Sequence, residues 1–287
     1  MPLFIAFLWV FVYSISMARE KDTIAASDEH NSRGIELADR GWLDEAVKEF
    51  KKAIELDPNS AHAHDNLATV FAEKKQFRGA LDEYLVALRL EPDSATAHYN
   101  LACFLSAHAI DFAISEYREA IELEPDYPDA HLNLGLTLAD VDRNEEATQE
   151  LKRAVELDGS DPLPRHELAG LEMDLGDYRS AITQLKEVVR LDPKNFEGWL
   201  DLGICYAQKG FYAEAERAYE SAKTLKGDDL LLTYNLGALY ALWSRPKDAI
   251  GYLRQAMGLD RAKVQAWLQS DPMFDGLKGD PEFEALN

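Results

Sequence analysis

The sequence predicts an all-α fold, a right-handed α-solenoid in which helical hairpins stack one on the next. Apolar residues between Ala61 and Pro92 recur at helical spacing in two runs, which Lys74, Lys75 and Gln76 separate. Versions of this stretch return along most of the chain. No segment of strand length alternates strictly between apolar and polar residues, and helices of about 12 to 14 residues need a neighbour to be stable.

The ends of the blocks define the period. Leu-Asp-Pro or Leu-Glu-Pro closes a block at Pro58, Pro92, Pro125 and Pro193, and Gly159 and Gly227 stand where two further ends belong. Successive ends are 34 residues apart, with one spacing of 33. Such a period indicates stacked helical hairpins. Seven repeats therefore occupy residues 27–263, and they start at Ser27, Ala61, Ala95, Pro128, Pro162, Phe196 and Leu230.

Small residues recur at fixed places in each block. Position 8 is Gly or Ala in every repeat, and position 20 is always Ala. A large residue follows four positions later, as Phe50 and Tyr84 show. Small side chains let two helices approach to about 8 to 10 Å, and the large one fills the remaining space. The pattern resembles the tetratricopeptide (TPR) repeat, a helix-turn-helix unit, and the resemblance covers residues 27–263.

Local signals agree with this frame. The residue before a block is a good helix cap in five of six cases: Ser60, Ser94, Asp161, Asn195 and Asp229. The third block is one residue short between Leu105 and Ala113, so we expect a tightened turn there.

Charge narrows the possible partners. The chain has 30 basic and 52 acidic residues, a net charge of −22. This surface disfavours nucleic acid and anionic lipid headgroups, and it favours a basic or neutral partner. Cys103 and Cys205 lie three repeats apart, so no disulfide is expected within the chain.

The two ends depart from the repeat pattern. The apolar run Leu3–Ile15 and the residues Ser16, Met17 and Ala18 suit a signal peptide or membrane anchor over residues 1–18, which predicts an exported or membrane-anchored protein. The alternative is that these residues form an apolar helix that is buried against the first repeat. Residues 19–26 are polar, as in a linker. Residues 264–287 are expected to form C-terminal capping helices, because two Asp-Pro pairs each precede a Phe.

No catalytic motif is apparent, so the sequence indicates a protein that is not an enzyme and needs no cofactor. It contains no Gly-rich phosphate loop and no Cys/His cluster at zinc spacing. His64, His98 and His131 share position 4 of consecutive repeats. Repeats about 10 Å apart place these rings too far apart for one metal ion, so we interpret the row as packing and predict no metal site.

The TPR resemblance implies a concave face formed by positions 2, 5, 6, 9, 12 and 13 of each first helix. Position 6 carries Asn66, Asn100, Asn133 and Asn235. Amides that both donate and accept can hold the backbone of an extended peptide, similar to the asparagine ladder of the O-linked N-acetylglucosamine transferase TPR superhelix. A solvated surface without a ligand is the alternative. Tyr99 belongs to an apolar floor between these amides, together with Cys103, Leu132 and Leu136.

The implied face carries acidic residues, among them Asp65, Asp129 and Asp201, and neither Lys nor Arg. TPR domains that bind acidic peptide tails use Lys and Arg at these positions, so an acidic tail is not the expected ligand. We therefore predict a non-catalytic scaffold that binds an extended basic or neutral peptide, with a membrane link only through the N-terminal segment. Two alternatives remain: an assembly factor acting through its convex face or self-association, and an accessory subunit that delivers substrates to an enzyme such as a glycosyltransferase.

Overall fold

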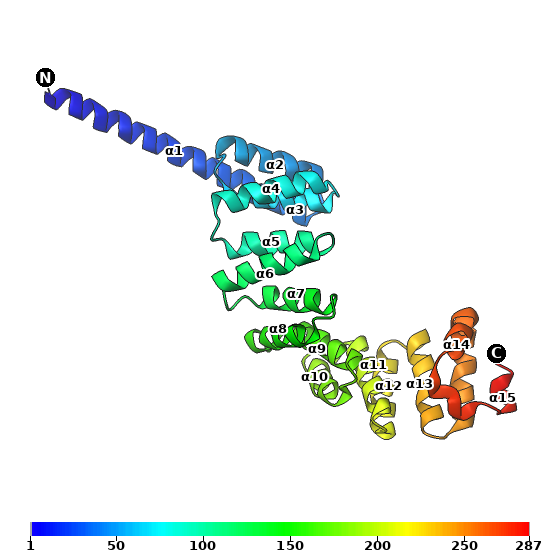
Figure 1. Ribbon diagram of the computed structural model, residues 1–287. Coiled ribbons are helices and arrows are strands. Elements are labelled where there is room, and N and C mark those ends of the chain that lie inside the picture. The colour runs from blue at the N-terminus through cyan, green and yellow to red at the C-terminus, as the bar shows by residue number, and fades with distance from the viewer. Residues whose placement is uncertain (1, 287) are drawn as a thin grey trace. The chain divides into compact units, whose positions relative to one another are not determined.

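The computed structural model describes residues 2–286, and it describes side chains for Met17 and from Lys21 onward (Figure 1). Helices dominate, and no β-strand occurs within residues 2–286. Contacts between residues divide the chain into unit 1, residues 1–137, and unit 2, residues 138–287. A linear array of repeats has no single central core, so its contacts can separate between neighbouring repeats.

Unit 1 consists of helical hairpins in which α1 packs on α2, α3 on α4, and α5 on α6. Successive hairpins pack on each other through contacts of α2 with α3 and of α4 with α5. The last helix, α7, runs across the boundary between the units. The bounds are α1 Pro2–Asp39, α2 Leu43–Leu56, α3 Ala61–Glu73, α4 Phe77–Leu90, α5 Ala95–Ser106, α6 Ile110–Leu123 and α7 Pro128–Ala139.

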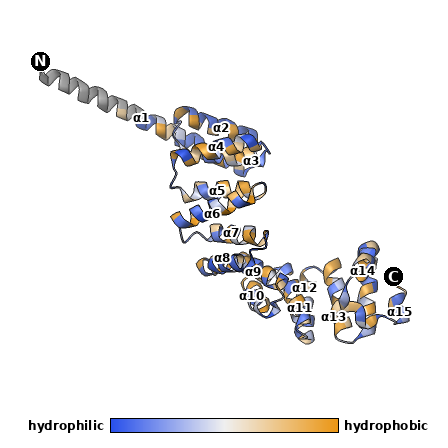
Figure 2. Ribbon diagram, viewed as in Figure 1, coloured by the Kyte–Doolittle hydropathy of each residue, from blue (hydrophilic) through white to orange (hydrophobic). Residues whose placement is uncertain are grey.

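Unit 2 continues the same architecture. Helix α9 packs on α10, α11 on α12, and α13 on α14. Figure 2 shows α13 as largely apolar, and most of its residues are buried. The bounds are α8 Asn144–Leu157, α9 Pro162–Asp174, α10 Tyr178–Leu191, α11 Phe196–Gln208, α12 Tyr212–Leu225, α13 Leu230–Leu242, α14 Pro246–Leu268, the 3-10 helix η1 Pro272–Leu277 and α15 Pro281–Glu284.

Six first helices begin at the block starts of the 34-residue frame, from Ala61 in α3 to Leu230 in α13. All five predicted helix caps are confirmed. Ser60 and Ser94 accept hydrogen bonds from the backbone N–H groups of Ala63 and Ala97. Asp161, Asn195 and Asp229 cap α9, α11 and α13 in the same way. These bonds satisfy N–H groups that have no partner inside the helix, and so they fix where each helix starts.

The core follows the small and large positions of the frame. The alanine at position 20 is fully buried in all seven repeats, and Phe50 and Tyr219 are examples of the buried large residue that follows it. A Cβ atom added at Gly34 would overlap the Phe50 ring, and one added at Gly203 would overlap the Tyr219 ring. Glycine at position 8 therefore allows the ring to lie against the backbone of the first helix.

The turn between the two helices contains a residue in the left-handed conformation in six of the seven repeats. Gly41, Gly176 and Gly210 have φ near +75°, while Lys75, Asp142 and Ser244 have φ near +58°. The next residue donates a backbone hydrogen bond to a carbonyl five residues earlier, as Gln76 does to Phe71. This is the Schellman ending of an α-helix. The third repeat has no left-handed residue in this turn, because the deletion removes that position and Ala109 leads directly into α6.

The N-terminal region differs from the expected linker, since residues 19–26 are helical and belong to α1. The side chains of the run Leu3–Ile15, in which a signal or anchor is predicted, lie outside the described residues. Of the residues that were described, none belongs to a helix that is both long and apolar enough to cross a membrane.

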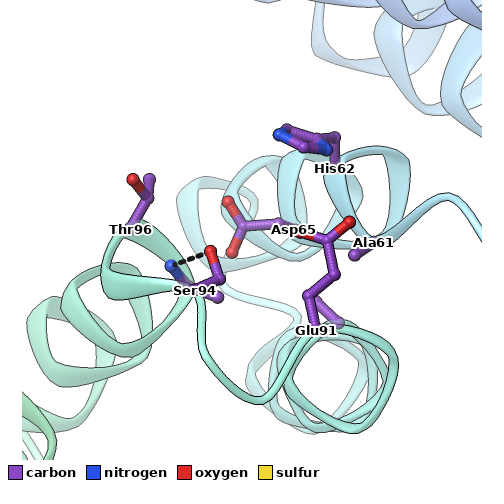
Figure 3. Close-up of a pocket in the computed structure, with 8 residues that line it drawn as sticks. Ala61, His62, Asp65, Glu91, Ser94 and Thr96 are labelled. Atoms are coloured by element: carbon purple, nitrogen blue, oxygen red, sulfur yellow. Dashed lines mark hydrogen bonds between the residues drawn. The ribbon is translucent and has the colours of Figure 1, made fainter. Parts of the chain in front are cut away.

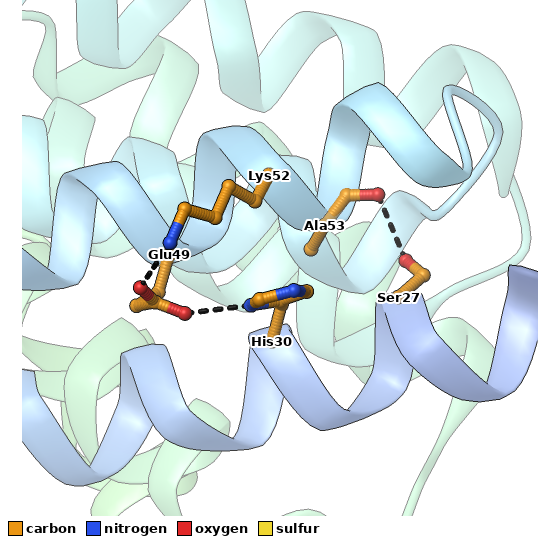
Figure 4. Close-up of polar contacts among 5 residues, drawn as sticks. All are labelled: Ser27, His30, Glu49, Lys52 and Ala53. Atoms are coloured by element: carbon orange, nitrogen blue, oxygen red, sulfur yellow. Dashed lines mark hydrogen bonds and ion pairs between the residues drawn. The ribbon is translucent and has the colours of Figure 1, made fainter.

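Hydrogen bonds and ion pairs join the two helices within a repeat, as Figure 4 shows for the first repeat. Ser27 Oγ donates to the Ala53 carbonyl oxygen at 2.9 Å, and His30 Nδ1 lies 2.6 Å from Glu49 Oε2. Lys52 and His30 together hold the pKa of the Glu49 carboxyl below its usual range. His64 and His98 repeat the contact, each 2.6 Å from a glutamate of the second helix. His30, His64 and His98 thus join the two helices of their own hairpins. The described residues hold no cluster suited to a metal.

The closing segment of unit 2 packs on the last hairpin. Asp271 caps η1 and Asp280 caps α15, as the two Asp-Pro pairs predict. Phe274 and Phe283 are 1% and 3% exposed and join the core cluster of α13 and α14. An apolar end of the solenoid is thereby covered.

Candidate binding face of the first helices

The predicted site residues lie on the first helices, and hydrogen bonds connect them from repeat to repeat. Position 6 of one repeat reaches position 5 of the repeat before it. Asn66 Nδ2 donates to Asn31 Oδ1 at 3.0 Å, and Asn100 Nδ2 donates to Asp65 Oδ2 at 2.6 Å. We call each such contact a rung. The rungs hold the side chains in one orientation relative to the next repeat.

A third rung in unit 1 joins Asn133 to Tyr99, whose phenol oxygen accepts from Nδ2 at 2.8 Å. We call Asn66, Asn100 and Asn133 the amide row. All three side chains are partly exposed. A primary amide has two N–H groups and an oxygen, and a rung uses one N–H, so Asn66 and Asn100 each retain a donor and an acceptor for a ligand. Asn133 retains its oxygen as an acceptor, while its Nδ2 also contacts Cys103 Sγ at 3.9 Å. The rung fixes where those groups point.

Tyr99 is the centre of an aromatic group beside the amide row. Its ring centroid lies 4.9 Å from that of Tyr127 and 6.0 Å from that of Tyr117. The Tyr117 hydroxyl donates to Cys103 Sγ at 3.4 Å. Of the predicted apolar floor, Leu132 is buried, whereas Cys103 is exposed and Tyr99 is half-buried. Leu136 is partly exposed, so the accessible floor consists of the Tyr99 ring, the Cys103 sulfur and part of Leu136.

The Asp65 carboxyl in unit 1 has an unusually high pKa. Burial raises the pKa of its carboxyl to about 6, against the opposing effects of the Asn100 hydrogen bond and of His62. Oδ2 accepts from Asn100, but Oδ1 is buried and has no hydrogen-bond partner within residues 2–286. At pH 7 and above this carboxylate is ionised with one oxygen unsatisfied, which is unfavourable in a protein interior.

In unit 2 one rung joins the same two positions, and the last repeat departs from the pattern. His166 Nε2 lies 2.9 Å from Asp201 Oδ2, and this contact raises the pKa of the His166 imidazole. Asn235 is only 8% exposed, and its Nδ2 donates to the carbonyl oxygen of Leu231 in its own helix. The amide predicted to hold a ligand at this position is instead part of the interior. Asp129, the remaining predicted residue, is exposed near the start of α7 in unit 1.

Sequence reasoning missed several participants: Asn31 and His166, which complete rungs, and His62 and Glu91, which lie near Asp65. The rung partners share position 5, directly before the amide in the sequence. That adjacency is a usable signal, because consecutive first helices of a solenoid lie side by side.

Family models match most of the repeat region. A model described as "Tetratricopeptide repeat" matches residues 166–229, another with the same description matches 128–161, and a model described as "TPR repeat" matches 34–75 and 109–142. Together these matches cover more than half of the chain.

Superkiller protein 3 from Schizosaccharomyces pombe is 32% identical over 72 residues, which amount to 25% of this chain and 5% of that protein. The chain thus spans only a small part of the curated relatives that it matches. This similarity is confined to a stretch of repeats.

Solved structures show the same fold. The TPR protein YrrB, described as having an unusual peptide-binding site, is 26% identical with a TM-score of 0.55, covering 64% of this chain and 95% of that one. The C-terminal part of a TPR protein from Cytophaga hutchinsonii has a TM-score of 0.67 at 17% identity, over 86% and 99% of the two chains.

TPR proteins are in general non-catalytic and bind other proteins. The helical hairpins, the buried small residues and the matched models assign this chain to the tetratricopeptide repeat family, as a protein–protein interaction scaffold.

Proposed function

We propose that the first-helix face of unit 1 binds an extended peptide segment of a partner protein, one that is basic or neutral. The amide row carries this proposal. Asn66, Asn100 and Asn133 occur once per repeat, and each is oriented by a rung. A repeat step of about 10 Å matches about three extended residues, so three amides suit a segment of about nine residues.

The sign of the ligand's charge follows from the side chains around the row. Asp65 and Asp129 belong to this face, and the positions that form it include neither Lys nor Arg. A carboxylate-rich segment would meet only like charge here, whereas lysine or arginine would be attracted. The peptide-binding description of YrrB, at 26% identity, supports peptide binding by this kind of array.

The test is a degenerate library of immobilised nine-residue peptides probed with the full chain at low and at high salt. Peptides enriched in Lys or Arg should bind, and their binding should weaken as salt rises. The double variant Asn100→Ala/Asn133→Ala should bind at least about tenfold more weakly, a loss of about 1.4 kcal/mol. Enrichment of Asp and Glu, or full binding by the double variant, would contradict the proposal.

A control variant separates binding from structure. His166→Ala removes a rung in unit 2, outside the amide row, and costs a hydrogen bond of similar kind. It should leave peptide binding unchanged. Circular dichroism at the assay temperature checks that all variants are folded.

Self-association is a second candidate, favoured by apolar side chains near the turns of unit 1. Trp42, Phe77 and Phe112 are 55%, 45% and 68% exposed. Large apolar side chains that water contacts are a common feature of protein interfaces. A sedimentation coefficient that rises with concentration in the absence of peptide, and no longer rises in Phe112→Ala, would support this candidate. A constant coefficient would exclude it.

Export or membrane anchoring through residues 1–18 remains part of the proposal. The observation behind it is the charge-free run Leu3–Ile15. Fractionation of cells, with mass spectrometry of the N-terminal peptide, tests it. Recovery of the intact N-terminus in the cytosol alone would contradict it.

A further inference from the structure

A pocket of about 80 Å³ lies in unit 1 where the starts of α3 and α5 meet the end of α4 (Figure 3). Three alanines form its apolar walls, and Figure 3 shows the Asp65 carboxylate extending from α3 toward Ser94 and Thr96. The residues that line the pocket are Ala61, His62, Asp65, Ala87, Glu91, Ser94, Thr96 and Ala97. The pocket therefore combines an apolar wall with a carboxylate.

The buried oxygen of Asp65 gives this pocket its chemical character. Oδ2 is engaged by Asn100, which holds the carboxylate in place, and Oδ1 has no donor within the described part of the chain. Leaving a buried acceptor unsatisfied costs roughly 1 to 3 kcal/mol, and more when the group is charged. A ligand that brings an N–H donor and a positive charge would remove this cost.

Two opposing electrostatic effects meet in the pocket. The N-termini of α3 and α5 each contribute about half a positive charge, which favours an anion. Asp65 and Glu91 contribute two negative charges, and neither Lys nor Arg is among the lining residues. The C-terminus of α4 also borders the pocket and adds about half a negative charge, so the sum is about −1.5, and neither Lys nor Arg opposes it. The pocket is thus complementary to a cation.

Size and shape indicate which cation. An alkyl chain ending in a compact ammonium group matches walls of alanine around a single buried oxygen. A planar guanidinium needs two acceptors in one plane to use its fork. Here the second oxygen of Asp65 is already occupied by Asn100.

We propose that this pocket binds the ammonium group of a lysine side chain, with Asp65 Oδ1 as its buried acceptor and Glu91 as a second, exposed counter-charge. The inference rests on the proposed function, because Asp65 directly precedes Asn66 of the amide row and holds Asn100 of the same row. A lysine in a segment bound along the row would enter the pocket from that side. Asp65 is then a residue that determines specificity.

The experiment uses a probe too small to need the whole row. Nα-acetyl-lysine N-methylamide is titrated into the 15N-labelled full chain at pH 7.5, and Nα-acetyl-norleucine N-methylamide serves as the uncharged analogue. The side-chain amide of Asn100 and the backbone amides of Thr96 and Ala97 should shift with the lysine probe alone. Equal shifts with norleucine, or no shifts at these groups, would overturn the proposal.

Asp65→Asn is the decisive variant, because it is isosteric and keeps an acceptor for Asn100. It should weaken binding of the lysine probe at least about tenfold while the protein becomes more stable at this pH. Glu172→Gln is the matched control. Glu172 is buried, and its Oε2 also has no partner within residues 2–286, but it lies outside the pocket. It should raise stability and leave lysine binding intact. Undiminished binding in Asp65→Asn would overturn the proposal.

The two proposals fail separately. If the small lysine probe shifts the pocket resonances but the peptide library shows no binding, the extended-segment proposal is wrong and the lysine pocket stands. If library peptides bind through the amide row but acetylation of their lysines changes nothing, the lysine pocket is wrong and the proposed function stands.

Discussion

The two units place the same repeat frame in different surroundings, and the first-helix positions behave differently as a result. In unit 1, position 6 of each repeat donates to position 5 of the one before, and the amide row is the outcome. In unit 2 the one such contact described joins His166 to Asp201, whereas in the last repeat Tyr234 at position 5 donates to Asp271 of the closing segment, and Asn235 donates to its own helix. The role of a position is therefore set by the neighbouring repeat as much as by the frame.

The units also differ in how their hairpins are covered. The closing segment of unit 2 buries Phe274 against α13, whereas in unit 1 the Phe112 side chain remains 68% exposed. The same residue type is thus a core element in one unit and a surface element in the other.

Phe274→Ala should have the largest effect on stability, because it empties a buried site in the core of unit 2. Truncation of a buried phenyl ring costs about 3 to 5 kcal/mol. Repeat arrays need not unfold in one step, so hydrogen exchange of the α13 amides is the appropriate measurement. Phe112→Ala is the matched control and should cost less than about 0.5 kcal/mol. Equal losses for the two variants would show that the closing segment does not stabilise α13.

Mutation of a rung should change stability in a pH-dependent way, with a gain of stability in unit 1 and a loss in unit 2. The folded-state pKa of Asp65 is raised from 3.8 to about 6, so the native state binds the proton more tightly and loses stability as pH rises between about 4 and 6. Asp65→Asn removes this loss. It should stabilise α3 to α5 by up to about 3 kcal/mol above pH 6, and by nothing below pH 4.

Mutation of the His166–Asp201 rung should lower stability instead of raising it. Asp201 raises the pKa of the His166 imidazole, so the stability it contributes is fully present below the unfolded pKa and is lost as pH rises through the folded value. Asp201→Asn should therefore destabilise unit 2 by roughly 1 kcal/mol at pH 5 to 6 and by little at pH 9. Hydrogen exchange of α9 and α11 at the two pH values measures it. A loss independent of pH would mean that the ion pair contributes nothing.

The turns within the repeats should show no difference between the units, because they are local structures. Lys75→Gly in unit 1 and Ser244→Gly in unit 2 each relieve a non-glycine residue at positive φ. Each should gain about 0.5 to 1 kcal/mol, and Gly210→Ala should lose a similar amount. Urea unfolding followed by circular dichroism measures the three variants. Losses in both glycine variants would contradict the assignment of strain to these turns.

Much of the fold could be predicted because its determinants are local. The starts of α3 and α13, the caps at Ser60 and Asp229, and the shortened turn before α6 depend on a few consecutive residues and on the period. Residues 19–26 were expected as a linker because they are polar. Their Ala, Glu, Lys and Arg residues are also good helix formers, and the structure continues α1 through them.

The candidate site could be predicted only in part, because it depends on contacts between repeats. The sequence identifies Asn100 and Asn133 by their shared position, but it does not show that Asp65 and Tyr99 accept their hydrogen bonds. Asn235 has the same position and is buried, because Leu232 and Leu236 beside it pack into the core with the closing segment. Burial of this kind depends on tertiary packing, which the periodicity of the sequence does not predict.

The most direct test of the binding face is photo-crosslinking of the full chain to a nine-residue peptide of Gly and Ser with one central Lys and a benzophenone group beside it. Crosslinked residues are identified by mass spectrometry. We expect crosslinks on the first helices of unit 1, around Asp65, Tyr99 and Asn133, and their loss with Asp65→Asn. Crosslinks confined to unit 2, or to the exposed side chains of Trp42, Phe77 and Phe112, would contradict it.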